Sequence, residues 1–177
     1  MITSMTFTAP AVERAPRPLA AAERTMIQAY LDWHRATVLC KCAGLTGEQL
    51  AEQAVPPSGM SLLGLVRHLA DVERSWLRIR FCGEDIDRIY SRPGNADADF
   101  TGTDPARAEQ DYATLLAEWR ACDAAVADAS LDDTFFFERE QAEVSLRCIY
   151  LHLIEEYARH NGHADMLRER IDGATGE

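Results

Sequence analysis

Glu156 and His160, near the C-terminal end of the chain, have the residue types and the spacing of a metal site. They lie four positions apart in the segment HLIEEYARHNGHAD, and residues four apart project from the same face of a helix. The rest of that face is apolar and includes Ile149, Leu153 and Leu167. A buried carboxylate or imidazole costs free energy unless it is hydrogen-bonded or bound to a cation, so this pair indicates a bound metal ion.

His68 supplies a third candidate ligand from a distant part of the chain. It lies within GLVRHLADVERSWL, three residues after Leu65 and four before Val72, and so faces inward with them. Alone, such a histidine is more often a core residue that is hydrogen-bonded to a carbonyl group. With Glu156 and His160 it completes a set of two histidines and one carboxylate, which is common in catalytic zinc sites and leaves a fourth position open. We therefore predict a divalent metal between two helices, with zinc as the first choice and nickel or iron as alternatives.

Two further histidines lie beside these ligands in the same segment. His152 is one helical turn before Glu156 and could be a fourth ligand or a hydrogen-bond partner of a ligand. His163 lies roughly 60° from the line through Glu156 and His160, by the ~100° per residue of an ideal helix. We expect His163 to lie at the rim of the site or to form a hydrogen bond with a ligand side chain on the side away from the metal.

Four amphipathic helices are predicted to position these residues. They cover about residues 19–42, 61–81, 104–129 and 145–172, with apolar residues at helical spacing in each. Ser61 is a good N-cap residue, and Gly173 is suited to end the last helix. Four such helices joined by two long connections favour an all-α four-helix bundle.

The segments between and before the helices carry less pattern. The long connection between the second and third helices, about residues 83–103, is rich in Asp and Gly, and loops of this length are usually functional or lie across the surface. The segment 131–144 could form a short strand or cover the open end of a bundle, but one isolated strand would not support a sheet. Residues 1–18 carry three prolines and are expected to form a flexible arm, which leaves 19–173 as a single domain.

Composition limits the possible partners. The chain has 177 residues, of which 47% are apolar, enough for a core that needs no disulfides. Its formal net charge of -11, from 29 acidic and 18 basic residues, disfavours binding to nucleic acids and to anionic membrane surfaces. No apolar run approaches the ~18–20 residues that span a bilayer. Five cysteines without a CxxC pair are typical of buried thiols in a reducing compartment, so we expect a soluble cytoplasmic protein.

Sequence motifs of several other enzyme classes are absent. The chain has no GxSxG nucleophile elbow, and no cysteine has a histidine beside it in sequence. It has no GxxxxGK(S/T) loop and no GxGxxG turn, so nucleotide binding is not expected. Catalytic residues other than the candidate metal ligands are therefore unknown at this level.

Two long stretches, PPSGMSLLGLVRHLADVERSWL and SLRCIYLHLIEEYARHNGHADMLRERIDG, resemble the DinB-like superfamily. The closer likeness is to the branch with the EEYARHNGHAD signature, which is described mainly as a domain of unknown function. The resemblance implies an up-down-down-up four-helix bundle with a divalent metal near one end. The superfamily's usual ligands are one histidine of the second helix and an Hx3H pair of the last. His68 and His160 match this pattern, whereas Glu156 replaces the commoner histidine, as in the related mycothiol-dependent maleylpyruvate isomerases.

The same resemblance implies a thiol-dependent activity. Relatives with a known activity are isomerases and S-transferases that use mycothiol, bacillithiol or glutathione. In such chemistry the metal binds the thiol and lowers its pKa; mycothiol is the first candidate, and a small electrophile is the second substrate. Arg67 and Arg159 flank the proposed ligands and could hold a substrate carboxylate, or could be ordinary solvated or ion-paired arginines. Members of the superfamily often pair through helix faces, which makes a homodimer a further expectation.

Two other functions fit the same residues. A metal-dependent hydrolase would use bound water as its nucleophile and would need a general base, for which Glu155, Asp71 and His163 are the candidates near in sequence. A non-catalytic metal-binding bundle would close the site with a fourth ligand, and His152 is the candidate for that position. Hydrolysis without added thiol would favour the first alternative, and a closed four-ligand site would favour the second.

Overall fold

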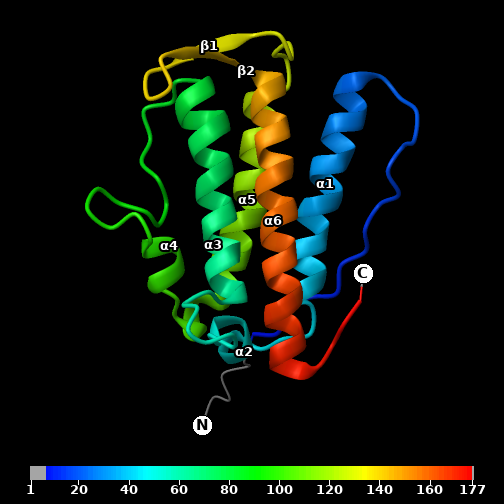
Figure 1. Cartoon of the computed structure of the whole chain (residues 1–177), viewed down its shortest axis with the longest axis vertical. Helices are drawn as coiled ribbons and strands as arrows, with labels where there is room; N and C mark the ends of the chain where they lie inside the picture. Colours follow the sequence, from blue (N-terminus) through cyan, green and yellow to red (C-terminus); the bar gives the residue numbers. More distant parts are fainter. Residues whose placement is uncertain (1–6, 177) are drawn as a thin grey trace.

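The computed structural model describes residues 7–176 and leaves residues 1–6 and 177 outside the description (Figure 1). Its helices are, in chain order, α1 (Glu23–Cys42), α2 (Gly47–Ala51), α3 (Leu62–Glu73), the π-helix η1 (Arg74–Phe81), α4 (Ala98–Thr101), the 3₁₀-helix η2 (Pro105–Arg107), α5 (Ala108–Ala125) and α6 (Leu146–Asp172). Its strands are β1 (Thr134–Phe137) and β2 (Ala142–Ser145). The described part is therefore mostly helical, with a small two-stranded sheet.

The long helices pack side by side. α1 packs against α6, and α3 packs against α5 and, over a smaller area, against α6. In Figure 1, α1 and α6 run downward along the chain, whereas α3 and α5 run upward. The candidate metal ligands come from α3 and α6, so the contact between these two helices decides whether the ligands meet.

None of the helices between residues 7 and 176 combines the length and the apolar character needed to cross a bilayer.

The predicted helix ends are confirmed where a capping residue marks them. The Oγ of Ser61 accepts the backbone N–H of Gly64 at 3.1 Å, and the Oγ of Ser145 accepts that of Cys148 at 3.2 Å. Each bond satisfies a backbone donor that has no partner inside the helix. At the other end of α6, Gly173 adopts a φ of 77°, which a glycine tolerates without strain.

Two helices are shorter than the sequence indicates. α1 begins at Glu23, and Leu19, which was expected to start it, is 92% exposed; without burial, helical propensity alone does not hold a further turn. α5 ends at Ala125, not near residue 129. The guanidinium of Arg24 donates to the carbonyl of Ala129 at 3.0 Å, and this bond from α1 takes up a backbone acceptor just after the helix end.

The second predicted helix changes its geometry halfway. It is α-helical as far as Glu73 and continues as the π-helix η1 from Arg74 to Phe81. π-helical turns are rare and frequently lie at functional sites. The change occurs at a fully buried glutamate, whose partners are described below.

Residues Thr134–Phe137 form a strand, one of the two structures predicted for this segment. The expectation that the strand would be isolated was wrong, because β1 pairs with β2 in an antiparallel hairpin. Thr134 lies opposite Ser145, and Phe137 lies opposite Ala142. The turn includes Gln141 at a φ of 51°, a left-handed conformation that sequence patterns do not signal for glutamine. In Figure 1 the hairpin lies across the upper end of the helices, and the ring of Phe137 packs on Trp76 of η1.

Residues 7–18 of the predicted arm contact the helices. Thr8 forms a β-bridge with Thr46, and the backbone carbonyl of Val12 accepts from the Cys40 thiol at 3.2 Å. Arg17 lies over the ring of Trp33, 4.1 Å from its centroid. Motion of this part of the arm would have to break these contacts, and residues 1–6 lie outside the described residues.

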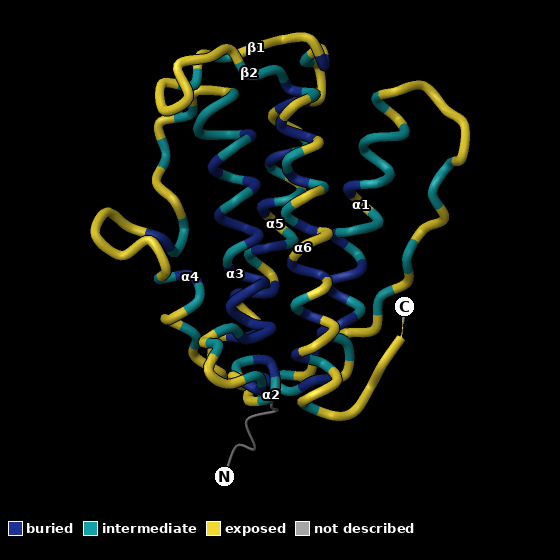
Figure 2. The backbone as a smooth tube through the Cα atoms, in the orientation of Figure 1, coloured by how far each residue is buried: buried dark blue, intermediate teal, exposed yellow. Residues whose placement is uncertain are grey.

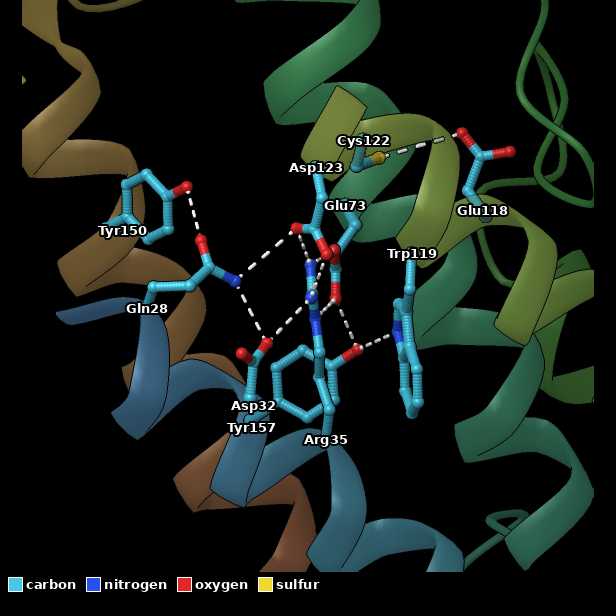
Figure 3. A network of polar contacts seen from close by, with 10 residues as sticks. All are labelled: Gln28, Asp32, Arg35, Glu73, Glu118, Trp119, Cys122, Asp123, Tyr150 and Tyr157. Carbon is cyan, nitrogen blue, oxygen red and sulfur yellow. Dashed lines mark hydrogen bonds and ion pairs between the residues drawn. The ribbon is translucent and has the colours of Figure 1, made fainter. Parts of the chain in front are cut away.

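The buried residues line the facing sides of the long helices (Figure 2). A polar network crosses this core (Figure 3). Arg35 of α1 donates to Glu73 of α3 through Nε at 2.9 Å and through Nη2 at 2.5 Å. Tyr157 of α6 donates to Glu73 at 2.6 Å and accepts from Trp119 of α5 at 2.7 Å, while Arg35 also donates to Asp123 at 2.9 Å. The network therefore joins all four long helices through one buried carboxylate.

Candidate metal centre

His68, Glu156 and His160 come together between α3 and α6. Nε2 of His68 lies 3.7 Å from Oε2 of Glu156, and Nε2 of His160 lies 3.4 Å from the same oxygen. One donor atom of each residue lies within 4.8 Å of the other two. Ligands at the zinc distances of ~2.0–2.2 Å lie roughly 3.3–3.6 Å apart around a tetrahedron. The three donors therefore have a spacing that suits one shared cation.

The orientation of the His68 ring leaves Nε2, the nitrogen that faces Glu156, without a hydrogen bond among the described residues. Nδ1 of His68 lies 2.8 Å from Oδ2 of Asp99, and because an ionised carboxylate only accepts, Nδ1 carries the proton in this bond. In the neutral imidazole Nε2 is then an acceptor with a free lone pair. This Nε2 is buried and has no hydrogen-bond partner among the described residues. A histidine that binds a metal almost always donates its other N–H to a carboxylate or carbonyl, so the arrangement fits a metal ligand.

Asp99 was missed by the sequence reasoning. It lies on the short helix α4, inside the connection that shows no helical period, and its side chain is only 4% exposed. The connection contains several aspartates, and nothing in their spacing singles out this one. The next residue, Phe100, stacks on the ring of His68 with centroids 4.6 Å apart. The connection thus contributes both a hydrogen bond and an apolar cover to the site.

His163 contacts the other candidate histidine. Its Nδ1 lies 3.3 Å from Nδ1 of His160, on the side away from Glu156. Burial above all, and then the Coulomb interaction with the neighbouring His68, lowers the pKa of His160 to about 4 from its ordinary value of 6.5. The His160 imidazole is therefore neutral at pH 7, which is the form that binds metals. The contact places His163 behind a candidate ligand, and its role stays a prediction.

His152 does not join the three donors. Its ring packs on Trp76 of η1, with centroids 4.6 Å apart, and burial lowers the pKa of its imidazole. Within residues 7–176, the group that could share a cation consists of His68, Glu156 and His160 alone. A tetrahedral cation at this site would therefore keep one position for water or a substrate.

The two arginines beside the candidate ligands differ in their contacts. Arg67 is buried; its Nη1 donates to the carbonyl of Gly102 and its Nη2 to that of Ala98 at 2.8 Å. Its guanidinium also lies over the ring of Tyr90 at 4.4 Å. These contacts favour a structural role for Arg67, which fastens the connection to α3. The side chain of Arg159 is 63% exposed and makes one long contact of 3.5 Å with Glu156, so it remains available to an anionic ligand.

The candidate general bases of a hydrolase are placed unfavourably. Asp71 accepts from the backbone N–H groups of Ile89 at 2.6 Å and Ser91 at 2.7 Å, and from the Ser91 hydroxyl at 2.8 Å. Its carboxylate thus fastens the connection to α3 and has little capacity left for a proton from water. Glu155 is exposed at the surface of α6. Of the three candidates, only His163 directly contacts the cluster.

A long-helix protein with a two-histidine, one-carboxylate cluster between α3 and α6 is what the DinB-like resemblance led us to expect. The sequence comparison is more specific: a family model described as Mycothiol-S-transferase matches residues 26–173. The chain belongs to this family, and through it to the DinB-like superfamily, which confirms the resemblance. Membership suggests a mycothiol-related transferase activity. No curated protein and no solved structure gives a significant match to the chain.

Proposed function

We propose that the protein is a metal-dependent transferase that joins mycothiol, or a similar low-molecular-weight thiol, to a small electrophile. The observation that carries the metal part is the buried Nε2 of His68, which has no hydrogen-bond partner within residues 7–176 and lies 3.7 Å from Oε2 of Glu156. A buried acceptor without a partner is costly, and a cation shared with Glu156 and His160 removes that cost. The family match supports the thiol part.

His68, Glu156 and His160 would hold the cation, with zinc as the first choice and nickel or iron as alternatives. When bound, it would lower the pKa of a thiol that coordinates it and so provide thiolate at neutral pH. The transfer joins the thiol sulfur to a carbon atom of the electrophile while the leaving group departs with its electron pair. The thiol proton is released to solvent. Isomerisation would use the same thiolate differently: the sulfur would add to a carbon atom of the electrophile and would leave that carbon again once the bond geometry has changed.

The residues around the cluster have distinct tasks in this proposal. Asp99 fixes the ring of His68 and keeps the proton on Nδ1, so that Nε2 is ready to bind the cation. Phe100 covers the outer face of that ring and limits access by water from its side. The exposed guanidinium of Arg159 is free to attract an anionic group toward Glu156, although no residue is assigned as a general acid or base.

We also propose that residues 19–173 form a single DinB-like four-helix bundle with up-down-down-up order. Its helices would be α1, α3 continued by η1, α5 and α6. The helix directions in Figure 1 and the packing of α1 on α6 and α3 on α5 support this arrangement. The homodimer, the cytoplasmic location and the flexible arm stay predictions.

The two alternative functions have less support. A hydrolase needs a general base, and the contacts of Asp71 with the 89–91 backbone use its carboxylate. A non-catalytic site closed by four protein ligands needs His152, whose ring packs on Trp76. Neither alternative accounts for the thiol named by the family.

Elemental analysis of the purified protein tests the metal site. We expect close to one divalent ion per chain, and strong loss of it in each of the variants His68→Ala, Glu156→Ala and His160→Ala. His34→Ala is a suitable control, because His34 lies on α1 outside the cluster. A full metal content in all three cluster variants would contradict the assigned ligands.

Turnover tests the transfer. The protein would be incubated with mycothiol and an electrophilic dye that fluoresces once it forms a thioether, with and without a chelator. We expect thioether formation above the uncatalysed rate, loss of this rate with the chelator, and recovery when zinc is restored. Activity that survives complete metal removal would overturn the proposal, and hydrolysis without thiol would favour the hydrolase.

A further inference from the structure

A second polar feature lies beside η1, outside the metal cluster. A cleft of about 650 Å³ separates η1 from the connection that leads to α4, and its walls include Ser75, Arg80, Arg88 and Arg92. Figure 1 shows this connection running down beside α3 before it reaches α4. Three arginines around one cleft are unusual in a chain whose formal net charge is -11, so their partners need to be identified.

Arg80 is half-buried, and the part of the chain that the structure describes provides no acidic partner for it. Its guanidinium lies over the rings of Trp76 at 4.6 Å and Phe137 at 5.4 Å, and its Nη1 donates to the hydroxyl of Ser75. Among the described residues no ion pair joins it to a carboxylate. Burial, followed by the charges of Arg88 and Arg139, lowers the pKa of this guanidinium. The two rings attract the guanidinium, but no carboxylate among the described residues neutralises its charge.

Arg88 reaches the same oxygen from the opposite wall. Its Nη2 donates to the Oγ of Ser75 at 3.0 Å, so two guanidinium groups share one neutral hydroxyl. Like charges brought together in this way repel each other, and the partial burial of Arg80 strengthens the repulsion because water screens it less on that side, while Arg88 is exposed. Arg92, on the same connection, adds a third guanidinium to the wall without an ion pair in the described structure.

An oxyanion would remove this repulsion. Guanidinium groups bind carboxylate and phosphate through paired, charge-assisted hydrogen bonds. Asp87 is the acidic residue of the cleft wall, and one carboxylate cannot balance three guanidinium groups. We propose that this cleft binds the carboxylate or phosphate group of a small acidic molecule, with the guanidinium groups of Arg80, Arg88 and Arg92 as its ligands.

The position of the cleft connects it with the metal cluster. Ser75 follows His68 by seven residues on the same continuous helix, which corresponds to ~10 Å along the axis at 1.5 Å per residue. A molecule with an anionic group at one end could reach from the arginines toward the cluster. This last step rests on the proposed transferase function. Under that function, the molecule bound in the cleft is the electrophilic substrate, and this substrate carries an acidic group.

Binding can be measured independently of turnover. The full-length protein as purified would be labelled with ¹⁵N and titrated at low salt with succinate and, separately, with inorganic phosphate. We expect saturable shifts of the backbone signals of residues 75–80 and 86–92 with at least one of the two anions. Binding of succinate alone identifies a carboxylate site, and binding of phosphate alone identifies a phosphate site.

Charge variants locate the bound anion. Arg80→Gln and Arg88→Gln should each weaken binding at least ~10-fold, the effect expected for loss of a charge-assisted hydrogen bond. Asp87→Asn should strengthen it, because it removes the competing carboxylate. The matched control is Arg120→Gln, which removes the same charge from an exposed arginine on α5 and should leave binding unchanged.

The His68→Ala variant separates this inference from the metal proposal. If the anion binds in the arginine cleft, the variant keeps the parent affinity whether or not it has lost its metal. Loss of binding in His68→Ala would place the anion at the metal cluster and overturn the inference. An affinity in Arg80→Gln equal to that of the parent, or no saturable binding of either anion by the parent, would also overturn it. The folded state of each variant is checked by its thermal unfolding midpoint.

Discussion

His68 and Asp99 are 31 positions apart in the chain, yet Nδ1 of His68 lies 2.8 Å from Oδ2 of Asp99. This bond links the middle of α3 to the short helix α4. The orientation of one candidate ligand therefore depends on a connection with little regular structure. Asp71 and Arg67, on α3, fasten the same connection at two other points, so the geometry of the cluster and the path of the connection are coupled.

Loss of the Asp99 carboxylate should weaken metal binding without removing a ligand. We expect Asp99→Ala to lower the zinc affinity by ~10–100-fold, the usual cost of losing the hydrogen-bond partner of a metal-binding histidine. Competition with a chromophoric chelator measures this change. Asp97→Ala, which removes an exposed carboxylate two positions earlier, is the control and should bind zinc like the parent. An unchanged affinity in Asp99→Ala would show that the bond does not support the ligand.

Glu156 can be tested by exchange for the histidine that is commoner in the superfamily. We expect Glu156→His to retain a bound metal, because an imidazole at this position still offers a lone pair toward His68 and His160. Glu156→Gln should lose most of it, since a neutral amide oxygen is a much weaker ligand than a carboxylate. Metal content after dialysis against a weak chelator distinguishes the two variants. Equal retention in both would argue that Glu156 is not a ligand.

Much of this arrangement could be predicted from the sequence, because it depends on local signals. Helical spacing of apolar residues placed His68, Glu156 and His160 on inward faces, and their donor atoms do converge. Serine caps at Ser61 and Ser145 fixed where α3 and α6 begin. Such features depend only on neighbouring residues, so one amino-acid sequence is enough to predict them and no alignment is needed.

The features that were missed depend on contacts between distant segments. The role of Asp99 depends on how the connection crosses α3, and one aspartate among several in a loop carries no signal of its own. The pairing of β1 with β2 depends on a turn with Gln141 in the left-handed region. Arg67, which precedes the candidate ligand His68 in sequence, donates to the carbonyls of Ala98 and Gly102. Helical spacing therefore indicated which three side chains converge, but it gave no indication of the contacts that hold them in place.

The buried network at Glu73 should dominate the stability of the fold. Removal of one charged partner leaves the other buried and unpaired, so we expect Arg35→Ala or Glu73→Ala to lower the free energy of unfolding by about 3–5 kcal/mol. Chemical unfolding in urea measures it. The surface pair between Arg147 and Glu23 is a matched control: Arg147 is one-third exposed and Glu23 more than half, and Glu23→Ala should cost far less than either core variant, because water screens an exposed pair.

The double variant Arg35→Met with Glu73→Leu distinguishes lost charge pairing from lost packing. Apolar residues of similar volume remove both buried charges at once, so the double variant should be more stable than either single alanine variant. The Tyr157 hydroxyl would lose its acceptor on Glu73, which limits the recovery. A double variant as unstable as the single variants would mean that the network acts mainly through its packing.

The stability of the metal-free protein should depend on pH through His160. Its pKa in the folded protein is about 4, against an ordinary value of 6.5. Above pH 6.5 both the folded and the unfolded states carry the neutral imidazole. As the pH falls from 6.5 toward 4, the unfolded state takes up the proton and the folded state does not, so stability is lost over this window.

Chelator-treated parent and His160→Gln would be unfolded in urea at pH 7 and at pH 5. Other groups titrate in both proteins, so the informative quantity is the difference between them. We expect the parent to lose on the order of 1 kcal/mol more than His160→Gln, after allowance for solvent screening. Equal losses in both proteins would mean that His160 titrates near its ordinary pKa and is not shielded by burial as the structure indicates.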